Sequence, residues 1–344
     1  MKSKKSIFSI AFILAVGGFV CYLVICLTEA GREYKATFFS MDTVMEITAY
    51  GKNAKSAISA ATERISEIEK EMSVNDEGSD TYRINHSGGE TVFISEDTLL
   101  VLDKAITVSQ MSDGALDITV FPIVQKWGFT TGNYGIPEKE EITSLLKSVD
   151  YKKIRIDESG AVITEEGMQV DFGALAKGFA ADEAAKVLRE NGVKSALLNL
   201  GGNICVVGTK PDGTDWNIAV KNPLSDGEYA GVLLISDKCA VTSGSYERFF
   251  EGADGEHYHH IIDPHTGYPA DSDFVSVTVV CEEGLYADAL STALFVAGYE
   301  RAADIWRTAN DFEFVGILKD GSVVYTEGLK ECFYTELFAI CVEK

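Results

Sequence analysis

The chain has 344 residues, of which 46% are hydrophobic, and such a length and composition are typical of a globular protein with a substantial buried core. Its formal net charge is −23, because 53 acidic residues outnumber 30 basic ones. So acidic a protein offers no basic patch to neutralise phosphates, which argues against a nucleic-acid partner. A phosphorylated small molecule is still compatible with this charge, provided that a metal ion or helix N-termini offset its phosphates.

The N-terminal segment differs from the rest of the sequence. Three lysines precede a nearly uncharged apolar run, Ile7–Leu27, which is about as long as the ~20 residues that cross a bilayer. Lysines ahead of such a run predict a cytoplasmic N-terminus and an extracytoplasmic body. A retained anchor is the favoured interpretation; a cleaved signal peptide, or lipidation at Cys21 or Cys26, is the alternative. We therefore expect an anchor over residues 1–30, one domain over residues 31–344, and a location on the extracytoplasmic face of the cell membrane.

The seven cysteines form no recognisable metal or disulfide pattern. No two of them have CxxC spacing, and those outside the apolar segment are scattered: Cys205, Cys239, Cys281, Cys332 and Cys341. An odd number of scattered cysteines predicts small core residues rather than a disulfide framework or a zinc site.

Hydrophobic periodicity and turn residues predict the secondary structure of the first half of the chain. The expected elements are a tether over 31–35, a strand over 44–50, an amphipathic helix over 54–72, a polar loop over 73–79, a helix capped by Ser95 and ending at Met111, and a short helix from Pro137 to Val149.

The second half is expected to be richer in strands. The expected elements are a hairpin of 154–156 with 162–164, a strand end at 170 leading into a helix that ends at Gly192, strands near 196–199, 204–207, 216–220, 231–235, 240–243, 260–263 and 275–280, a helix containing 286–292, and strands near 314–318, 323–326 and 338–342. Many strands with a few helices indicate an α+β fold with mixed, largely antiparallel sheets.

Oxygen-bearing side chains cluster in the helix expected around residues 286–292. Asp288 and Thr292 are four residues apart and therefore project from one helical face, with Ser291 beside Thr292. An all-oxygen set suits a hard cation such as Mg²⁺ or Ca²⁺ better than zinc. The alternative is an aspartate in a first helical turn, stabilised by the helix dipole, with Ser and Thr on a solvated face.

Other polar residues stand out for their apolar or glycine-rich surroundings. Asp117 lies in an apolar run, so its carboxylate must find partners or lie at the edge of a site. Lys177 is near an expected helix start, where backbone amides can hold a phosphate. Asp171 and Lys177 could equally form a surface ion pair of little energetic value.

Four of the five histidines fall between residues 257 and 265. No companion cysteine or second histidine group supports zinc binding there. A histidine in this segment is a candidate general base, because its pKa lies near the working pH. We expect His257, His259 and His265 to be exposed polar residues of a loop.

Several of these stretches, in this order along the chain, resemble the ApbE family, the FAD:protein FMN transferases. The matching stretches are Ser40–Thr43, Gly114–Thr119, Val170–Gly178, Leu200–Asn203, Thr242–Tyr246, His260–Gly267 and Ala287–Thr292. The resemblance covers the chain from about residue 34 onwards and implies an ApbE-like (T-fold-like) architecture. It also implies Mg²⁺-dependent cleavage of FAD, with FMN attached to a threonine of an acceptor protein and AMP released.

The resemblance assigns roles to individual residues. Those implied to line the FAD site are Met41, Asn75, Ala115, Leu116, Asp117, Asp171, Lys177 and Ile262. Those implied to hold Mg²⁺ are Asp288, Ser291, Thr292 and the backbone carbonyl of Ala174. His260 is expected to be the general base that deprotonates the acceptor hydroxyl, and Asp288 is the alternative.

Two positions depart from the family pattern. Many relatives carry an aspartate where Ser291 lies, and a neutral serine is a weaker ligand, so Mg²⁺ affinity is expected to fall or Ca²⁺ to be better tolerated. Many relatives carry an aromatic residue where Asn75 lies, and such a ring would stack and exclude water. Tyr82 is a candidate substitute for that ring.

The expected partners are therefore FAD and a threonine of a membrane redox subunit or secreted flavoprotein. Two other functions stay open. One is an Mg²⁺-dependent FAD pyrophosphatase that yields FMN and AMP, because Asn75 leaves the scissile phosphate more open to water. The other is a non-catalytic FAD-binding protein.

Overall fold

The computed structural model describes residues 31–157 and 161–344. The anchor predicted over residues 1–30 lies outside these described residues. Within them, no helix has both the length and the apolar character needed to cross a bilayer.

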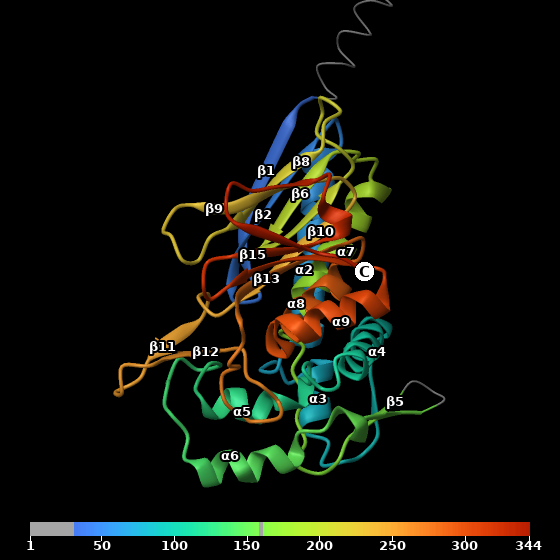
Figure 1. The fold of residues 1–344 in the computed structure, drawn as a ribbon. Helices are drawn as coiled ribbons and strands as arrows, with labels where there is room; N and C mark the ends of the chain where they lie inside the picture. Colours follow the sequence, from blue (N-terminus) through green and yellow to red (C-terminus); the bar gives the residue numbers. More distant parts are fainter. Residues whose placement is uncertain (1–30, 158–160) are drawn as a thin grey trace, which may run out of the picture.

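A long, nine-stranded sheet forms the centre of the molecule (Figure 1). Neighbouring strands are antiparallel except the last two, which are parallel. This arrangement confirms the predicted α+β class with a mixed, largely antiparallel sheet. The strand order is β1 (Glu33–Ser40), β2 (Thr43–Tyr50), β6 (Ala196–Leu200), β7 (Asn203–Val207), β10 (Cys239–Gly244), β13 (Phe274–Cys281), β14 (Glu313–Leu318), β15 (Val323–Thr326) and β17 (Ala339–Val342).

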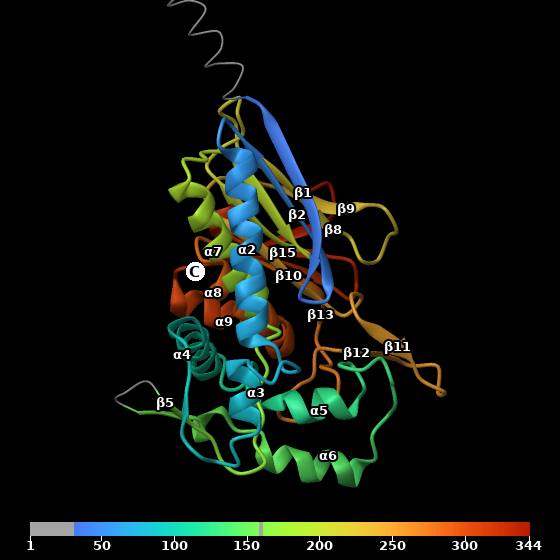
Figure 2. The same cartoon turned by 180° about the vertical axis from the view of Figure 1, so that it is seen from behind.

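Helices cover one face of this sheet (Figure 2). Helix α7 (Ala176–Glu190) packs between α2 (Ala54–Met72) and α8 (Gly284–Ala297), and α8 lies against β10 and β13. Helices α4 (Glu96–Met111) and α9 (Tyr299–Ala309) pack against α8. Because α8 is enclosed by other elements, most of its residues are buried, which explains its nearly continuous apolar sequence.

A smaller three-stranded sheet covers the opposite face. Its strands are β8 (Trp216–Lys221), β9 (Tyr229–Ile235) and β16 (Phe333–Tyr334). Burial alternates strictly along β8, so one side of this sheet faces the core and the other faces solvent. Its inner residues pack against Val206, Ala240 and Val280 of the central sheet. The middle strands of the central sheet are therefore buried on both faces.

Shorter elements extend the molecule beyond one end of the sheet. They are α3 (Asp80–Asn85), β3 (Val92–Phe93), η1 (Ile118–Val120), α5 (Phe121–Lys126), α6 (Lys139–Leu145), η2 (Leu146–Ser148), η3 (Tyr151–Lys153), β4 (Arg155–Ile156), β5 (Ala161–Ile163), β11 (Phe249–Glu251) and β12 (His257–His259). The short helix η4 (Glu327–Leu329) packs instead against β14 of the central sheet. A small separate cluster of Ile123, Trp127, Ile142 and Ile262 holds α5 and α6 to the chain that follows β12. The Trp127 indole also donates to the Gly267 carbonyl at 2.9 Å.

Some elements differ from those predicted. Residues 33–35 of the tether expected over 31–35 belong to strand β1, whose half-buried alternation is too weak to mark it as a strand. No strand ends at Val170 or spans 260–263; of the latter only Ile262 makes a bridge, with Pro269. The helix expected from Pro137 begins at Lys139, where Glu138 and Glu141 form a capping box.

The prediction that the cysteines form no disulfide was wrong. Cys205 and Cys239 lie directly opposite each other on β7 and β10, with Cα atoms 4.0 Å apart, and form a disulfide. They are 34 residues apart in sequence, so only the strand pairing brings them together. Cys281, Cys332 and Cys341 are free thiols.

Helices α7 and α8 approach each other unusually closely, through a glycine on each. A Cβ atom at Gly178 would lie 2.2 Å from the Gly284 carbonyl oxygen, and one at Gly284 would lie 2.8 Å from that of Gly178. Both neighbours are backbone atoms, so no side chain can move aside. Glycine at these positions therefore sets the separation of the two helices.

We expect Gly178→Ala to lower the free energy of unfolding by about 1–3 kcal/mol, because the helices must separate to admit the methyl group. Chemical denaturation of the purified protein measures this loss. The matched control is Gly135→Ala, since a Cβ there meets nothing within 4 Å and its φ is not positive. Equal stability of the two variants would contradict the role of Gly178.

Candidate functional site

Three side-chain hydroxyls meet where α8 faces the end of β10, in the helical turn that follows Asp288. Asp288 and Ser291 of α8 are buried, and Ser291 Oγ donates to the Asp288 carbonyl at 2.9 Å. Ser243 of β10 places its Oγ 2.8 Å from Ser291 Oγ and 3.2 Å from Thr292 Oγ1. The structure thus joins the hydroxyls of two predicted metal ligands, Ser291 and Thr292, through Ser243.

The start of α7 supplies a donor and a positive charge to this cluster. The backbone N–H of Gly178 donates to Asp288 Oδ2 at 2.8 Å. Lys177 Nζ lies 3.9 Å from the same oxygen and donates to the Gly173 carbonyl at 3.3 Å. Ala174, the fourth predicted ligand, follows Gly173 in the turn before α7. Lys177 pairs with the buried Asp288, so it does not form the surface ion pair with Asp171 that was the alternative.

Asp171 lies in the segment that leads into this helix. Its backbone N–H donates to the Ile118 carbonyl at 3.1 Å, which joins the segment to the stretch around Asp117. Burial raises the pKa of the Asp171 carboxyl, against the opposing effects of the Gly173 amide and the Lys177 charge. Asp171 is therefore positioned beside Lys177 without forming a close pair with it.

His260 is held in one orientation by the chain before β11. Its backbone N–H donates to the Arg248 carbonyl at 3.0 Å, and its Nδ1 lies 3.2 Å from the same oxygen. Because a carbonyl only accepts, Nδ1 carries the proton and Nε2 keeps a free lone pair. Burial lowers the pKa of His260 to about 4, and the positive charges of Arg248 and Lys177 act in the same direction. The ring is therefore neutral at ordinary pH.

The Asp117 carboxylate is hydrogen-bonded, as its apolar surroundings in the sequence require. Its Oδ1 accepts from the Thr119 amide at 2.8 Å and from the Thr119 hydroxyl at 2.6 Å, while its Oδ2 accepts from the Tyr151 amide at 2.9 Å. Burial raises its pKa. Ala115 and Leu116, the neighbouring predicted FAD contacts, are buried beside it. A cavity of about 130 Å³ opens here, and His265 lies on its wall.

Met41 occupies the tip of the β1–β2 hairpin. Met41 and Asp42 both have positive φ, 49° and 58°, as a two-residue type I′ turn requires. Glu69 of α2 fixes this turn by accepting from the Met41 amide and the Ser40 hydroxyl, each at 2.7 Å. Thr43, at the start of β2, packs so closely on Gly201 that a Cβ there would lie 2.5 Å from its methyl carbon. The hairpin and the glycine turn therefore lie side by side.

Asn203 follows that glycine turn and was not singled out as a site residue. It is 2% exposed, and its Nδ2 donor has no hydrogen-bond partner within the described part of the chain. Asn203 lies opposite Val241 of β10. Ser243 is two residues further along β10 than Val241, so its side chain and that of Asn203 lie on the same face of the sheet. A buried donor without a partner is costly, so it marks a place where a ligand acceptor would fit. The Gly201-Gly202-Asn203 sequence is the signal by which the sequence could have identified Asn203 as a site residue.

The two remaining predicted FAD contacts, Asn75 and Ile262, differ in exposure. Asn75 is exposed in the polar loop after α2, and Ile262 is buried in the cluster around Trp127. Tyr82, considered as a substitute for an aromatic residue at 75, is stacked on His86 with ring centroids 3.8 Å apart.

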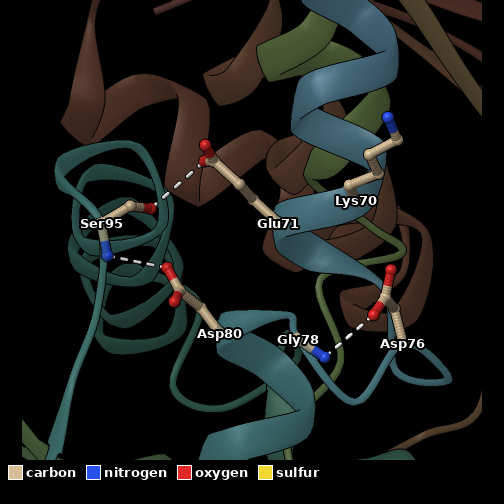
Figure 3. A pocket seen from close by; sticks show the side chains of 6 residues that line it. All are labelled: Lys70, Glu71, Asp76, Gly78, Asp80 and Ser95. Atoms are coloured by element: carbon tan, nitrogen blue, oxygen red, sulfur yellow. Dashed lines mark hydrogen bonds between the residues drawn. The ribbon is translucent and has the colours of Figure 1, made fainter.

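A cavity of about 360 Å³ lies beyond the C-terminal end of α2 (Figure 3). Carboxylates dominate its wall, and none of the predicted site residues lines it: Lys70, Glu71, Asp76, Gly78, Asp80 and Ser95. Such a wall repels phosphates, so this cavity does not suit the diphosphate of a dinucleotide.

The histidine segment is only partly the exposed loop that was predicted. His257 and His265 are exposed, but His257 belongs to strand β12. His259 is buried, and its Nε2 pairs with the Ala270 carbonyl at 3.2 Å. Burial lowers its pKa, so it is a neutral core residue.

Comparison with known proteins agrees with this geometry. Residues 41–315 match the ApbE family. The chain belongs to the ApbE family. Among curated ApbE relatives, the FAD:protein FMN transferase of Treponema pallidum is 31% identical over 87% of this chain and 88% of its own. A transferase of the same name from Klebsiella pneumoniae is 30% identical over 85% of this chain and 90% of its own.

Solved ApbE structures share the fold. The crystal structure of the ApbE protein of Thermotoga maritima superposes with a TM-score of 0.82 at 31% identity, covering 88% of this chain and 99% of its own. The flavin transferase ApbE of Vibrio cholerae superposes with a TM-score of 0.74 at 26% identity, covering 89% of this chain and 97% of its own.

We expect Asp117→Asn to lower the free energy of unfolding by about 1–3 kcal/mol, because an amide NH₂ must then face a backbone or hydroxyl donor in a buried place. Thermal or chemical denaturation measures the change. The matched control is Asp113→Asn, whose side chain is 77% exposed and whose positive φ asparagine tolerates. An unchanged stability of Asp117→Asn would show that the three hydrogen bonds add little.

Proposed function

We propose that this protein transfers the FMN part of FAD to a threonine hydroxyl of an acceptor protein and releases AMP. The observation that carries the proposal is the arrangement of oxygen-bearing side chains on α8: the hydroxyls of Ser291 and Thr292 meet Ser243, and the preceding turn holds Asp288 beside Lys177. Membership of the ApbE family supports it, since curated relatives bear the name FAD:protein FMN transferase.

The donor set fits a hard divalent cation. One buried carboxylate and three hydroxyls offer only oxygen ligands, which suit Mg²⁺ or Ca²⁺. We assign the metal to Asp288, Ser291, Thr292 and the Ala174 carbonyl, with Ser243 orienting the two hydroxyls of α8. When bound, Mg²⁺ would stabilise the negative charge that builds up on the pyrophosphate as it is cleaved.

The chain's own residues support the remaining requirements. Lys177 offers a positive charge to a phosphate in a protein that is otherwise strongly acidic. Met41, Asp117, Asp171 and the buried donor of Asn203 offer contacts for the flavin and nucleotide portions. His260 keeps Nε2 unprotonated and neutral, so it is able to accept the proton of the attacking threonine.

A second candidate function is hydrolysis of FAD to FMN and AMP. Asn75 is exposed and polar, and Tyr82 is stacked on His86 instead of replacing the missing aromatic ring. Water would then reach the phosphate more easily and compete with the acceptor hydroxyl.

We also propose that the protein acts on the extracytoplasmic face of the membrane, on a redox subunit or secreted flavoprotein. The apolar N-terminal run motivates the location. The disulfide between Cys205 and Cys239 supports it, because disulfides persist in oxidising compartments.

The deciding experiment incubates the purified chain with FAD and Mg²⁺, with and without a candidate acceptor subunit. AMP release that requires the acceptor, together with an added flavin phosphate on one of its threonines by mass spectrometry, supports transfer. AMP release without acceptor supports hydrolysis, and FAD binding without AMP supports a binding protein. EDTA should stop either reaction, and Asp288→Asn should weaken Mg²⁺ binding in calorimetry.

We expect His260→Asn to lower turnover by at least ~10²-fold while leaving the Kd for FAD unchanged, because a general base contributes about 10²–10⁴-fold. Asparagine keeps a donor for the Arg248 carbonyl but has no counterpart of Nε2. The matched control is His257→Asn, which changes an exposed histidine of the same segment. Retained turnover would exclude His260 as the base and favour Asp288.

The pH profile gives an independent check of the same assignment. Since the pKa of His260 is about 4, its protonation should not slow turnover as pH falls through 6.5, and a decline should set in only as pH approaches 4. A fall in turnover centred near pH 6.5 that disappears in His260→Asn would contradict the neutral state of this ring.

A further inference from the structure

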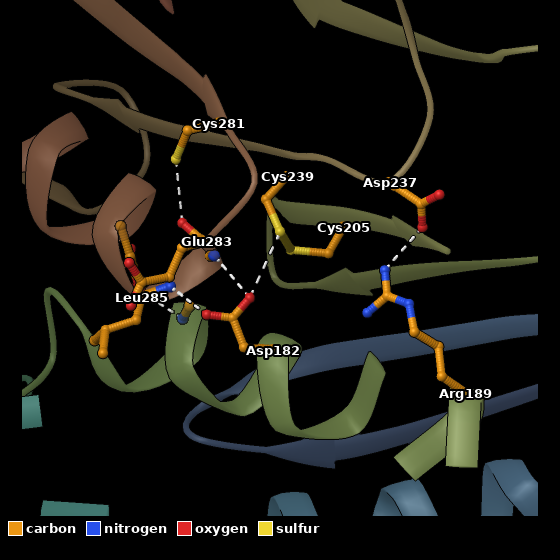
Figure 4. Close-up of a disulfide and its surroundings, with 11 residues drawn as sticks. Asp182, Arg189, Cys205, Asp237, Cys239, Cys281, Glu283 and Leu285 are labelled. Carbon is orange, nitrogen blue, oxygen red and sulfur yellow. Dashed lines mark hydrogen bonds and ion pairs between the residues drawn. A yellow bond between two sulfur atoms is a disulfide. The ribbon is translucent and has the colours of Figure 1, made fainter. Parts of the chain in front are cut away.

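Three cysteines lie in one row across three neighbouring strands (Figure 4). Cys239 of β10 is directly opposite Cys205 of β7 on one side and directly opposite Cys281 of β13 on the other. Residues opposite each other in antiparallel strands point to the same face, and all three belong to the core on the helical side. A free cysteine thus lies opposite Cys239 on the side away from Cys205, with its thiol turned towards the Glu283 carbonyl.

The hydrogen-bond pattern sets the spacing within the row. The Val206 amide donates to the Lys238 carbonyl, so the adjacent pair Cys205–Cys239 is of the non-hydrogen-bonded kind. In a strand with two antiparallel neighbours, a residue that forms a non-hydrogen-bonded pair with one neighbour forms a hydrogen-bonded pair with the other. The pair Cys239–Cys281 is therefore hydrogen-bonded, and the Cα atoms of such pairs are about 5.5 Å apart. That separation lies within the range that disulfides span, but the Cβ atoms of such a pair are farther apart than the ~3.5–4.5 Å of a disulfide, so a Cys239–Cys281 bond requires a local shift of the two strands.

Burial restricts what can react with this disulfide. Cys205, Cys239 and Cys281 are 2%, 4% and 5% exposed, so a thiol from solution does not reach the bond in the folded protein. Cys281, whose thiol donates to the Glu283 carbonyl at 3.2 Å, is the neighbouring free thiol on the same sheet face. The other free cysteines of the described chain, Cys332 and Cys341, lie outside this row.

We propose that this row is an internal thiol–disulfide exchange site, in which Cys281 takes over the bond to Cys239 and releases Cys205. The Cys281 thiolate attacks Cys239 Sγ, the Cys205–Cys239 bond breaks, and Cys205 leaves as a thiolate. The proton lost by Cys281 ends on Cys205, so the protein is neither oxidised nor reduced. Attack comes from one side of Cys239 and the leaving sulfur departs on the other.

The surroundings of the row connect it to the helices that carry the candidate site. Asp182 of α7 accepts from the amides of Gly284 and Leu285, at 2.7 and 2.8 Å, where α8 begins. A Cβ at Gly284 would lie 3.2 Å from Cys205 Sγ, so that sulfur packs directly against the same turn. Release of Cys205 therefore changes the contacts of the first turn of α8, whose next turn carries Asp288.

The exchange is slow at neutral pH and accelerates in base. Burial raises the pKa of Cys281 to about 12, with the nearby Asp182 and Glu283 carboxylates acting in the same direction. Only the thiolate attacks, so the rate should rise about tenfold per pH unit below that pKa. Burial raises the pKa of Asp182 to about 6, so its carboxylate is ionised at neutral and basic pH.

The test maps disulfides in the full chain, purified without reductant and held folded at pH 7, 8.5 and 9.5. Acid quenching, alkylation of free thiols and mass spectrometry of peptides then identify each bond. We expect the Cys205–Cys239 link at pH 7, and a Cys239–Cys281 link with alkylated Cys205 that forms about tenfold faster per pH unit. An unchanged Cys205–Cys239 link at every pH overturns the proposal.

Two variants check the pairing independently of that rate. Under a mild oxidant, Cys205→Ser should form a Cys239–Cys281 bond, because these two cysteines remain neighbours. Cys239→Ser should form no disulfide between Cys205 and Cys281, since a whole strand separates them. Links to Cys332 or Cys341 in the wild-type chain would indicate scrambling through unfolding, and circular dichroism before quenching confirms that the protein is folded. Such links, or failure of Cys205→Ser to form the bond, contradict exchange within the row.

Discussion

A buried hydrogen bond between two helices positions the candidate site: the Gly178 amide of α7 donates to Asp288 Oδ2 of α8. This bond requires the glycine contact between the helices, because any side chain at Gly178 would meet the Gly284 backbone. A carboxylate taken out of water is costly unless donors and charge compensate it. Gly178 supplies the donor and Lys177 the charge, so Asp288 is held at a fixed place in a protein that is otherwise strongly acidic.

The same two helices are joined a second time, where α8 begins. The Asp182 carboxylate accepts hydrogen bonds from two backbone amides of the first turn of α8, which have no partner within their own helix. The cap of α8 is therefore supplied by the neighbouring helix α7, not by the residue that precedes α8. The Asp182 carboxylate also neighbours the cysteine row, so the start of α8 is packed against sulfur atoms as well as capped by Asp182. The candidate cation site and the disulfide therefore share one pair of helices and are separated by little more than a helical turn.

The sequence predicted much of the fold where local patterns are strong. The helix over 54–72 has its predicted bounds, and Ser95 caps α4 as expected, because apolar spacing and a capping hydroxyl are local properties. Prediction is weaker where the pattern is short or half-buried: the sequence predicts a tether over the first residues of β1, and a strand over 260–263 where only Ile262 forms a bridge. The helical spacing of oxygen-bearing residues predicts Asp288, Ser291 and Thr292 as one site. It does not predict the residues of other elements that contact them, such as Ser243.

By itself, the sequence determined the acidic character, the α+β class and the oxygen-bearing face of α8, since each depends on composition or on residues a few positions apart. The tertiary structure decided which distant residues meet that face: Ser243, Lys177 and the amide of Gly178. It also decided that Cys205 pairs with Cys239, that His259 is buried, and that the Asn203 donor lacks a partner among the described residues. These facts depend on strand register and helix separation, which are set by packing across the whole sheet rather than by residues that are neighbours in sequence.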